Sequence, residues 1–261
     1  MNSDRSHPYG YIDRQTDDIQ IQMAKGQNIA GFPLGILYID DVWYPMLPGN
    51  VVNGWSYDFP IRLKAVKGLT IERLFAAKED VWADLERAIR ELEEEGVRAI
   101  SGACGFFGNF QREAASAAHV PVALSSLVQV PWIQAVLHPR KKIGVLTADA
   151  SSITSRLLES CNISDSGRLV IADLRHAPEF SCILEGRGSF DNAKVKQEML
   201  EAARGLLRSD PDIGAILLEC SDMPPYAVYV QNEVGLPVFD FFTLIHWLVR
   251  SVSQKPYGGF I

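Results

Sequence analysis

Two segments of the chain carry the same pattern of residues. An Ala-Ile pair begins a short apolar run at Ala99 and again at Ala215, and a cysteine stands five residues after each alanine, as Cys104 and Cys220. A Pro-Val pair then lies seventeen residues beyond each cysteine. Short apolar runs between turn signals are typical of buried strands. The repeat therefore predicts two halves built alike, each of which places one thiol at the end of a buried strand.

The length and charge of the chain narrow the class of protein. Its 261 residues fit two domains of about 100–150 residues. The net charge is −7 and no segment is rich in lysine or arginine, so neither a nucleic acid nor a membrane surface is an expected partner. The polar N-terminus does not resemble a signal peptide, and no apolar run approaches the about 18 residues of a membrane-spanning helix. The four cysteines are not closely spaced, and we expect them to be reduced thiols in the cytoplasm.

Apolar runs and amphipathic segments alternate along the chain. The runs predict strands at 34–39, 61–66, 97–103, 120–124, 143–146, 169–173, 213–219 and 237–239. Helical spacing predicts helices at 79–95, 110–118, 127–137, 150–160, 192–207, 225–232 and 241–252, with Gly96 ending the first and Asp191 capping the fifth. This alternation is typical of parallel sheets flanked by helices on both faces.

The repeat favours two α/β lobes over one long sheet. We expect an N-terminal extension at 1–28, a first lobe at 29–138 that includes the closing helix within 240–261, and a second lobe at 139–239. Ligands of such sheets bind beyond the carboxyl ends of the strands, where Cys104 and Cys220 are expected. The predicted active site therefore lies between the lobes, with one thiol on each wall.

Position separates two of the four cysteines from the others. Cys161 and Cys182 have no counterpart in the other half, and we interpret them as buried structural residues. Cys104 and Cys220 each follow a strand and precede a helix, where backbone N–H groups and a helix dipole would lower the pKa of a thiol. Two thiols facing across a cleft can invert an acidic carbon: one removes a proton from one face and the other returns a proton to the opposite face.

Neighbouring residues supply the other parts of such a site. Backbone N–H groups of Gly105-Phe106 and Ser221-Asp222 would stabilise the carbanion at its carboxylate or carbonyl oxygens. Two interpretations of Asp222 stay open, since it would either hold a substrate ammonium group or cap the helix near Pro225, and the cap is preferred. The chemistry requires neither a metal nor an organic cofactor, and the five histidines show no metal-ligand spacing.

These residues resemble the aspartate/glutamate racemase superfamily, which includes hydantoin racemases, maleate cis-trans isomerases and arylmalonate decarboxylases. The resemblance spans about 32–253 and rests on three segments: Gly102-Ala103-Cys104-Gly105, Leu217 to Tyr226, and the loop Pro48 to Asn53 followed by Phe59-Pro60. It implies two flavodoxin-like lobes and cofactor-free deprotonation by Cys104 and Cys220. It also implies that Asn53 and Thr147 line the substrate pocket and that the protein is a homo-oligomer.

The chain departs from many amino-acid racemases of this superfamily after each cysteine. Gly105-Phe106-Phe107 and Ser221-Asp222 stand where those proteins have more polar residues, which indicates a substrate larger and less polar than aspartate. We therefore expect a cofactor-independent racemase of an amino acid, or of a related compound with an acidic stereocentre, whose small-molecule partner carries a carboxylate or carbonyl group. The alternatives are a maleate-type isomerase, a cysteine hydrolase with His246 as base, and a non-catalytic binder of carboxylates.

Overall fold

Each half of the chain forms a four-stranded parallel sheet, and the strand order is the same in both. The first sheet contains, in spatial order, β2 (Ile61–Val66), β1 (Leu34–Ile39), β3 (Ile100–Gly102) and β4 (Val122–Ala123). The second contains β6 (Leu169–Asp173), β5 (Lys142–Thr147), β7 (Ile213–Leu218) and β8 (Val238–Phe239). The computed structural model describes residue 23, residues 25–255 and residues 257–261, so the predicted extension at 1–28 lies mostly outside the described residues. The predicted α/β fold with two similar lobes is confirmed.

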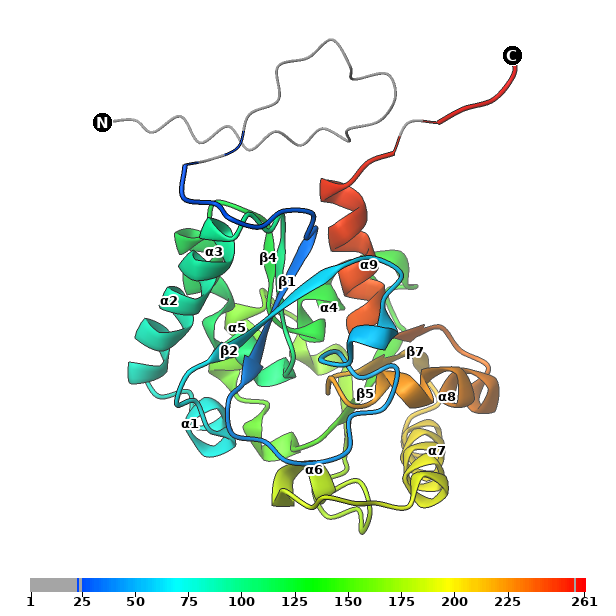
Figure 1. Ribbon diagram of the computed structural model, residues 1–261. Helices are drawn as coiled ribbons and strands as arrows, with labels where there is room; N and C mark the ends of the chain where they lie inside the picture. The colour runs from blue at the N-terminus through cyan, green and yellow to red at the C-terminus, as the bar shows by residue number, and fades with distance from the viewer. Residues whose placement is uncertain (1–22, 24, 256) are drawn as a thin grey trace.

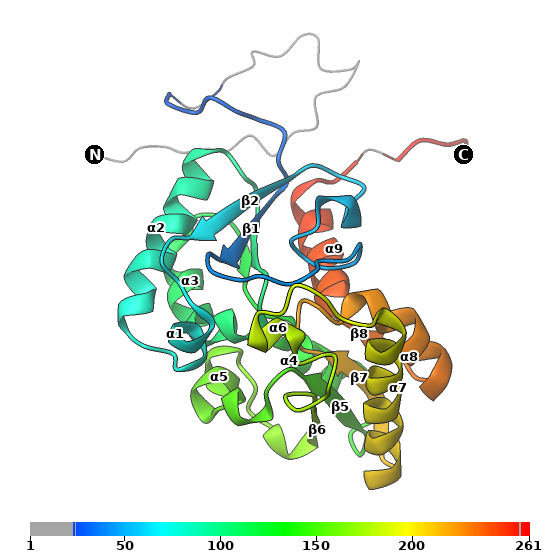
Figure 2. The ribbon, with the colours of Figure 1, turned by 60° about the horizontal axis from the view of Figure 1, so that its bottom comes forward.

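Helices cover both faces of the first sheet (Figures 1 and 2). On one face lie α2 (Asp80–Glu94) and α3 (Gln111–Ala117), and on the other lies α9 (Phe241–Val252). Alternation along β1 explains this arrangement, because Leu37 and Ile39 pack toward α2 whereas Leu34 and Ile36 pack toward α9. Gly96 has φ +83° and follows α2, as predicted for a residue that ends a helix.

The second sheet is covered in the same way. Its outer face packs against α7 (Asn192–Ser209) and α8 (Ala227–Val234), and Asp191 caps α7 as predicted. Its other face packs against α4 (Val130–Val136) and α5 (Ser155–Ser160), which belong to the same apolar cluster as the core of the first lobe. The core is therefore continuous between the lobes.

In each lobe, one of the helices that pack on the sheet comes from the half of the chain that forms the other lobe. The closing helix α9 packs on β1 of the first sheet, and α4, within the range expected for the first lobe, contacts β5 of the second. The lobe limits at 138 and 240 stay a prediction. Within the described part of the chain, no helix is long and apolar enough to cross a membrane.

Short elements account for most differences from the predicted secondary structure. The short helices α1 (Ile71–Phe75) and α6 (Cys182–Glu185) were not predicted. Four predicted helices begin as 3-10 turns, at Gly105–Phe110, Ser126–Gln129, Ala150–Ser152 and Pro224–Tyr226. Two further 3-10 turns are Gly54–Ser56 and Ser166–Arg168. A turn or two of helix is too short for hydrophobic periodicity to reveal.

Candidate active site

Cys104 and Cys220 occupy equivalent places in the two lobes. Cys104 follows β3 and Cys220 follows β7, two strands with the same position in their sheets. Both thiols are largely buried, with 9% and 6% of each residue exposed, and both line one pocket. The other residues that line it are Ile39, Val42, Tyr44, Ile71, Phe75, Ala103, Phe106, Ala148, Ile183, Leu184, Glu219, Ser221 and Asp222. The pocket thus draws on both lobes and opens where the two cysteine turns meet.

Hydrogen bonds hold the two cysteine turns against each other. The Ser221 hydroxyl donates to the carbonyl of Ala103 at 2.9 Å, which joins the turn after β7 to the turn after β3. The Ser126 hydroxyl donates to the carbonyls of Leu218 and Glu219 at 3.0 and 3.1 Å. The two Ser126 bonds are buried, so they keep backbone carbonyls satisfied where water is excluded.

Asp222 connects the second lobe to the loop that follows β1. Its carboxylate accepts a hydrogen bond from the Tyr44 hydroxyl at 3.2 Å and another from the Asn50 amide. The Cys220 thiol also donates to it, with 3.5 Å between Sγ and Oδ2. The preferred interpretation of Asp222 as a helix cap is wrong, because its oxygens are committed to these side chains across the pocket. Burial raises the pKa of Asp222 to about 6, so the carboxylate is ionised at neutral pH.

The surroundings of both thiols raise their pKa, contrary to the prediction. Burial raises the pKa of Cys104, and the negative charge of Glu219 adds to the effect. Burial also raises the pKa of Cys220, together with the charges of Asp222 and Glu219. Backbone N–H groups do point at the sulfurs, from Phe106 and Phe107 to Cys104 and from Asp222 to Cys220. Their effect is smaller than that of desolvation, so both cysteines are protonated thiols at neutral pH.

Glu219 is a buried carboxyl group close enough to both thiols for its charge to affect them, and the sequence analysis did not single it out. Its side chain is 0% exposed, and Oε2 accepts a hydrogen bond from the Thr147 hydroxyl at 2.9 Å. Burial raises the pKa of Glu219 to about 7. The signal in the sequence was an acid at the end of a buried apolar strand, directly before the cysteine.

Comparison with known proteins decides the family. No protein-family profile matches the chain. The dimethylsulfoniopropionate lyase of Durusdinium sp. clade D is 31% identical over 243 residues, which cover 90% of this chain and 80% of that protein. Dimethylsulfoniopropionate lyase 5 of Emiliania huxleyi (strain CCMP1516) is 30% identical over 239 residues, which cover 87% of this chain and 46% of that protein. The chain belongs to the dimethylsulfoniopropionate lyase family. It spans about half the length of the second relative.

Solved structures confirm the predicted fold. The allantoin racemase of Klebsiella pneumoniae superposes with a TM-score of 0.57 at 17% identity, over 87% of this chain and 96% of that one. Unliganded arylmalonate decarboxylase superposes with a TM-score of 0.53 at 16% identity, over 85% and 94%. The aspartate racemase of Picrophilus torridus superposes with a TM-score of 0.51 at 18% identity, over 87% and 96%. The chain therefore has the fold of the aspartate/glutamate/hydantoin racemase superfamily, while its relatives in sequence are named as lyases.

The residues expected to bind substrate divide into two groups. Phe106, Ser221 and Asp222 line the pocket of this lyase-family protein. Asn53 does not, because its amide donates to the carbonyl of Met46 and accepts from the N–H of Trp55 within its own loop. Thr147 is fully buried behind Glu219, and the Ser221 hydroxyl is engaged by Ala103. The loop residue that reaches the site is Asn50, three positions before the one predicted.

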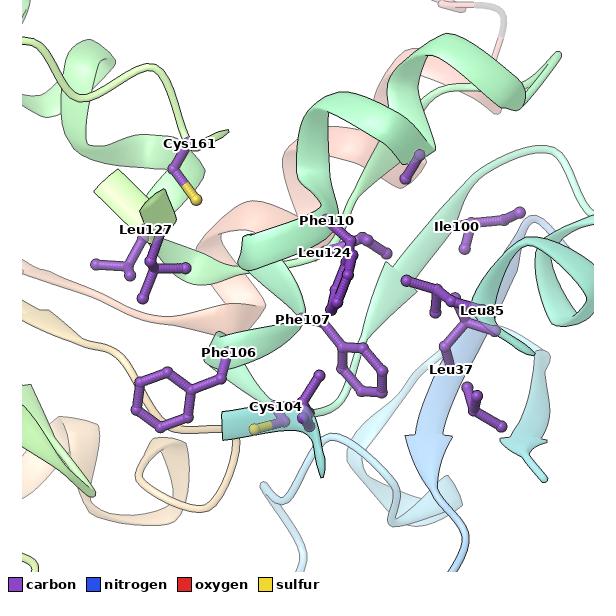
Figure 3. Close-up of a cluster of buried hydrophobic side chains, with 14 of the residues drawn as sticks. Leu37, Leu85, Ile100, Cys104, Phe106, Phe107, Phe110, Leu124, Leu127 and Cys161 are labelled. Atoms are coloured by element: carbon purple, nitrogen blue, oxygen red, sulfur yellow. The ribbon is translucent and has the colours of Figure 1, made fainter. Parts of the chain in front are cut away.

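The two phenylalanines after Cys104 have different places. Figure 3 shows the rings of Phe106 and Phe107 on opposite sides of the turn, with Phe107 toward Leu37 and Leu85. Phe107 is fully buried in the core, whereas Phe106 lines the pocket and lies 4.3 Å from Phe75 between ring centroids. Only Phe106 can therefore make the substrate site less polar.

Other candidate groups lie away from the pocket. The Cys161 thiol donates to the carbonyl of Gly108 at 3.8 Å, a contact that joins α5 to the turn after Cys104. His246 is exposed on α9 beside Phe59 and Phe242, so it is not placed to activate Cys104 as a hydrolase base. Among the described residues, no group of three or more His, Cys, Asp or Glu side chains is arranged to hold a metal ion.

Replacing Glu219 by glutamine should stabilise the protein above neutral pH. The carboxyl has a pKa of 4.5 when exposed and about 7 in the folded chain, so the folded state binds more protons between these values and stability falls as pH rises through them. Glu219→Gln removes this loss and should add about 2–3 kcal/mol of stability above pH 7. Below about pH 4.5 the two proteins should be equally stable, since the carboxyl is then protonated in both states. Urea unfolding across this pH range measures the difference, and a pH-independent difference would contradict a neutral buried carboxyl.

Proposed function

We propose that the protein is a lyase that eliminates a neutral sulfide from a carboxylate bearing a sulfonium group, with dimethylsulfoniopropionate as the substrate. The observation that carries this proposal is the composition of the pocket. Its lining includes two acids and three aromatic rings, and none of the lining residues in the described part of the chain is lysine, arginine or histidine. Such a pocket favours a positively charged, apolar group over a second carboxylate. The family relationship supports the same conclusion.

Asp222 and the aromatic rings are suited to hold the sulfonium group. The Asp222 carboxylate is held by Tyr44 and Asn50 and is ionised above about pH 6. Phe75 and Phe106 lie at an angle of 60° to each other and line the same pocket. A desolvated cation gains about 2 kcal/mol from an aromatic face. The methyl groups on sulfur would pack against these rings while the positive charge faces Asp222.

Cys104 is the thiol better placed to act as the base. N–H groups of Phe106 and Phe107 point at its sulfur, which stabilises a thiolate. The Cys220 sulfur instead faces the carboxylate of Asp222, which favours its protonated form. A bound sulfonium cation would favour ionisation of Cys104, because it supplies a positive charge that none of the described lining residues provides.

The elimination balances with these groups alone. The Cys104 thiolate takes a proton from C2, next to the substrate carboxylate, and the electron pair of that C–H bond forms the C2=C3 double bond. The C3–S bond breaks with its electrons going to sulfur, so neutral dimethyl sulfide and acrylate are released. Cys104 loses its own proton to solvent when the substrate binds, and the proton taken from C2 restores the thiol of the free enzyme.

A racemase is the second candidate, because both thiols line one pocket. Elimination needs one base, whereas inversion of a stereocentre needs a group on each face. The test is incubation with dimethylsulfoniopropionate, with head-space dimethyl sulfide and dissolved acrylate both measured. Equal release of the two products supports the lyase. Loss of optical rotation by an amino acid or a hydantoin, without sulfide release, would support the racemase and overturn the lyase.

A further inference from the structure

One oxygen of Glu219 has no hydrogen-bond partner in a fully buried position. Oε2 is occupied by Thr147, but Oε1 has no donor or acceptor among the described residues. An unpartnered buried carboxylate oxygen is costly, since it has lost its water without a replacement. Because Glu219 also lines the pocket that holds both thiols, its free oxygen is available to a bound molecule.

Glycine at position 105 is what leaves space for this carboxyl group. A Cβ atom at Gly105 would overlap with Oε1 of Glu219 and lie 2.7 Å from the Glu219 carbonyl oxygen. The carboxyl therefore lies against the backbone directly after Cys104. This places Oε1 at the turn where the substrate carboxylate would meet the thiolate.

We propose that Glu219 acts as a neutral carboxylic acid whose Oε1–H donates a hydrogen bond to a carboxylate oxygen of the substrate. The inference rests on the proposed elimination, in which charge moves onto those oxygens as the C2 proton leaves. A neutral donor suits a pocket without a cationic side chain among its described lining residues. An ionised Glu219 would instead repel the substrate carboxylate. The hydrogen bond strengthens as negative charge develops, which lowers the barrier.

Several groups face Glu219 and affect its ionisation. Asp149, on the loop after β5, is paired with Arg175 and lies close enough for its charge to favour a neutral Glu219. Asp222 acts in the same direction from the turn after β7. The thiols of Cys104, Cys220 and, on α5, Cys161 also face it. Burial and these negative neighbours favour the neutral carboxyl, and together they outweigh the hydrogen bonds from Thr147 and from the N–H of Ala148, which favour the ionised form.

The pH dependence of turnover tests the proposal. The active state has a neutral Glu219 and a Cys104 thiolate. The more populated state with the same total number of protons has an ionised Glu219 and a Cys104 thiol. In the wild type, kcat/KM should therefore rise with pH and level off above about pH 7, where that proton count no longer changes. Glu219→Gln keeps a neutral N–H donor, so its kcat/KM should match the wild type below about pH 7 and then keep rising, by about tenfold per pH unit.

Two outcomes of this experiment would overturn the proposal. Superimposed profiles would mean that Glu219 has only a structural role. Loss of activity in Glu219→Gln at every pH would mean that the ionised carboxylate is required. Glu219→Leu, which has no donor, serves as the matched control and should lose kcat/KM by about tenfold or more across the whole range.

Binding and infrared measurements keep this test separate from the proposed function. Acrylate binding is measured in the Asp222→Asn protein, in which Asp222 no longer titrates. The affinity should fall above about pH 7 in this protein, and it should not fall in the double variant that also carries Glu219→Gln. An infrared band of a protonated carboxylic acid should be present at about pH 6 and absent in Glu219→Gln. If dimethylsulfoniopropionate is not consumed but both results hold, the lyase proposal fails and the role of Glu219 stands. If binding is independent of pH and the band is missing, the Glu219 proposal fails by itself.

Discussion

Replacing Cys104 by serine should reduce kcat/KM for dimethylsulfoniopropionate by about 10²–10⁴-fold, because a serine hydroxyl is too weak an acid to supply the base. Cys220→Ser should cost only about tenfold, since serine can donate the same hydrogen bond to Asp222. Head-space measurement of dimethyl sulfide gives both rates. The asymmetry follows from the different surroundings of the two sulfurs.

Cys182 provides a matched control for the two pocket thiols. Cys182→Ser changes another buried thiol, which does not line the pocket of Cys104 and Cys220, and it should leave turnover close to the wild type. Equal and complete loss in Cys104→Ser and Cys220→Ser would point to a mechanism with two bases. A larger loss in Cys220→Ser would reverse the roles that we assign to the two thiols.

Asp222→Asn should raise the KM for dimethylsulfoniopropionate by at least about tenfold, because it removes the negative charge opposite the sulfonium group. The pKa of Asp222 is raised to about 6, so in the wild type KM should fall as pH rises through this value and the carboxylate ionises. In the asparagine variant KM should lack this step. The analogue 3-(methylthio)propionate, which keeps the carboxylate but has an uncharged sulfur, is the control ligand, and its affinity should not fall in the asparagine variant. A KM unchanged by the substitution would contradict the cation site.

Strands and long helices could be predicted because their patterns are local. The strands at 34–39, 61–66 and 169–173 and the closing helix at 241–252 have the limits expected from the sequence. The repeat around Ala99 and Ala215 correctly indicated that β3 and β7 are equivalent. Buried strands need continuous apolar residues and amphipathic helices need a fixed spacing, so both leave a signal within a few residues.

The chemistry of the site depended on contacts that no local pattern contains. Asp222 is held by Tyr44 and Asn50, from the loop on the opposite lobe. Asn53 matched a sequence motif, yet its amide is used within its own loop. The sequence analysis expected a lowered pKa for both thiols, and this direction was wrong. The N–H groups after each cysteine could be inferred from the sequence, whereas the burial of the thiols and the nearby charge of Glu219 could not.

The fold of the enzyme was predicted correctly, whereas its reaction stays a proposal. The sequence motifs around the paired thiols predicted the fold of the racemase superfamily, and the solved structures confirm that fold. Racemisation itself rested on the presence of two thiols. In the structure, two N–H groups point at the sulfur of Cys104. None of the described residues that line the pocket has the basic side chain that would bind the second carboxylate of a dicarboxylate.

Proton NMR of dimethylsulfoniopropionate with the wild-type enzyme in D₂O is the most direct measurement of the central claim. Elimination by a thiolate in the pocket between the lobes predicts that the signals of dimethyl sulfide and acrylate grow together as the substrate disappears. Substrate that stays intact would contradict the claim. If its C2 protons also exchange for deuterium, the thiols remove the proton without expelling the sulfide, and the chemistry is that of a racemase.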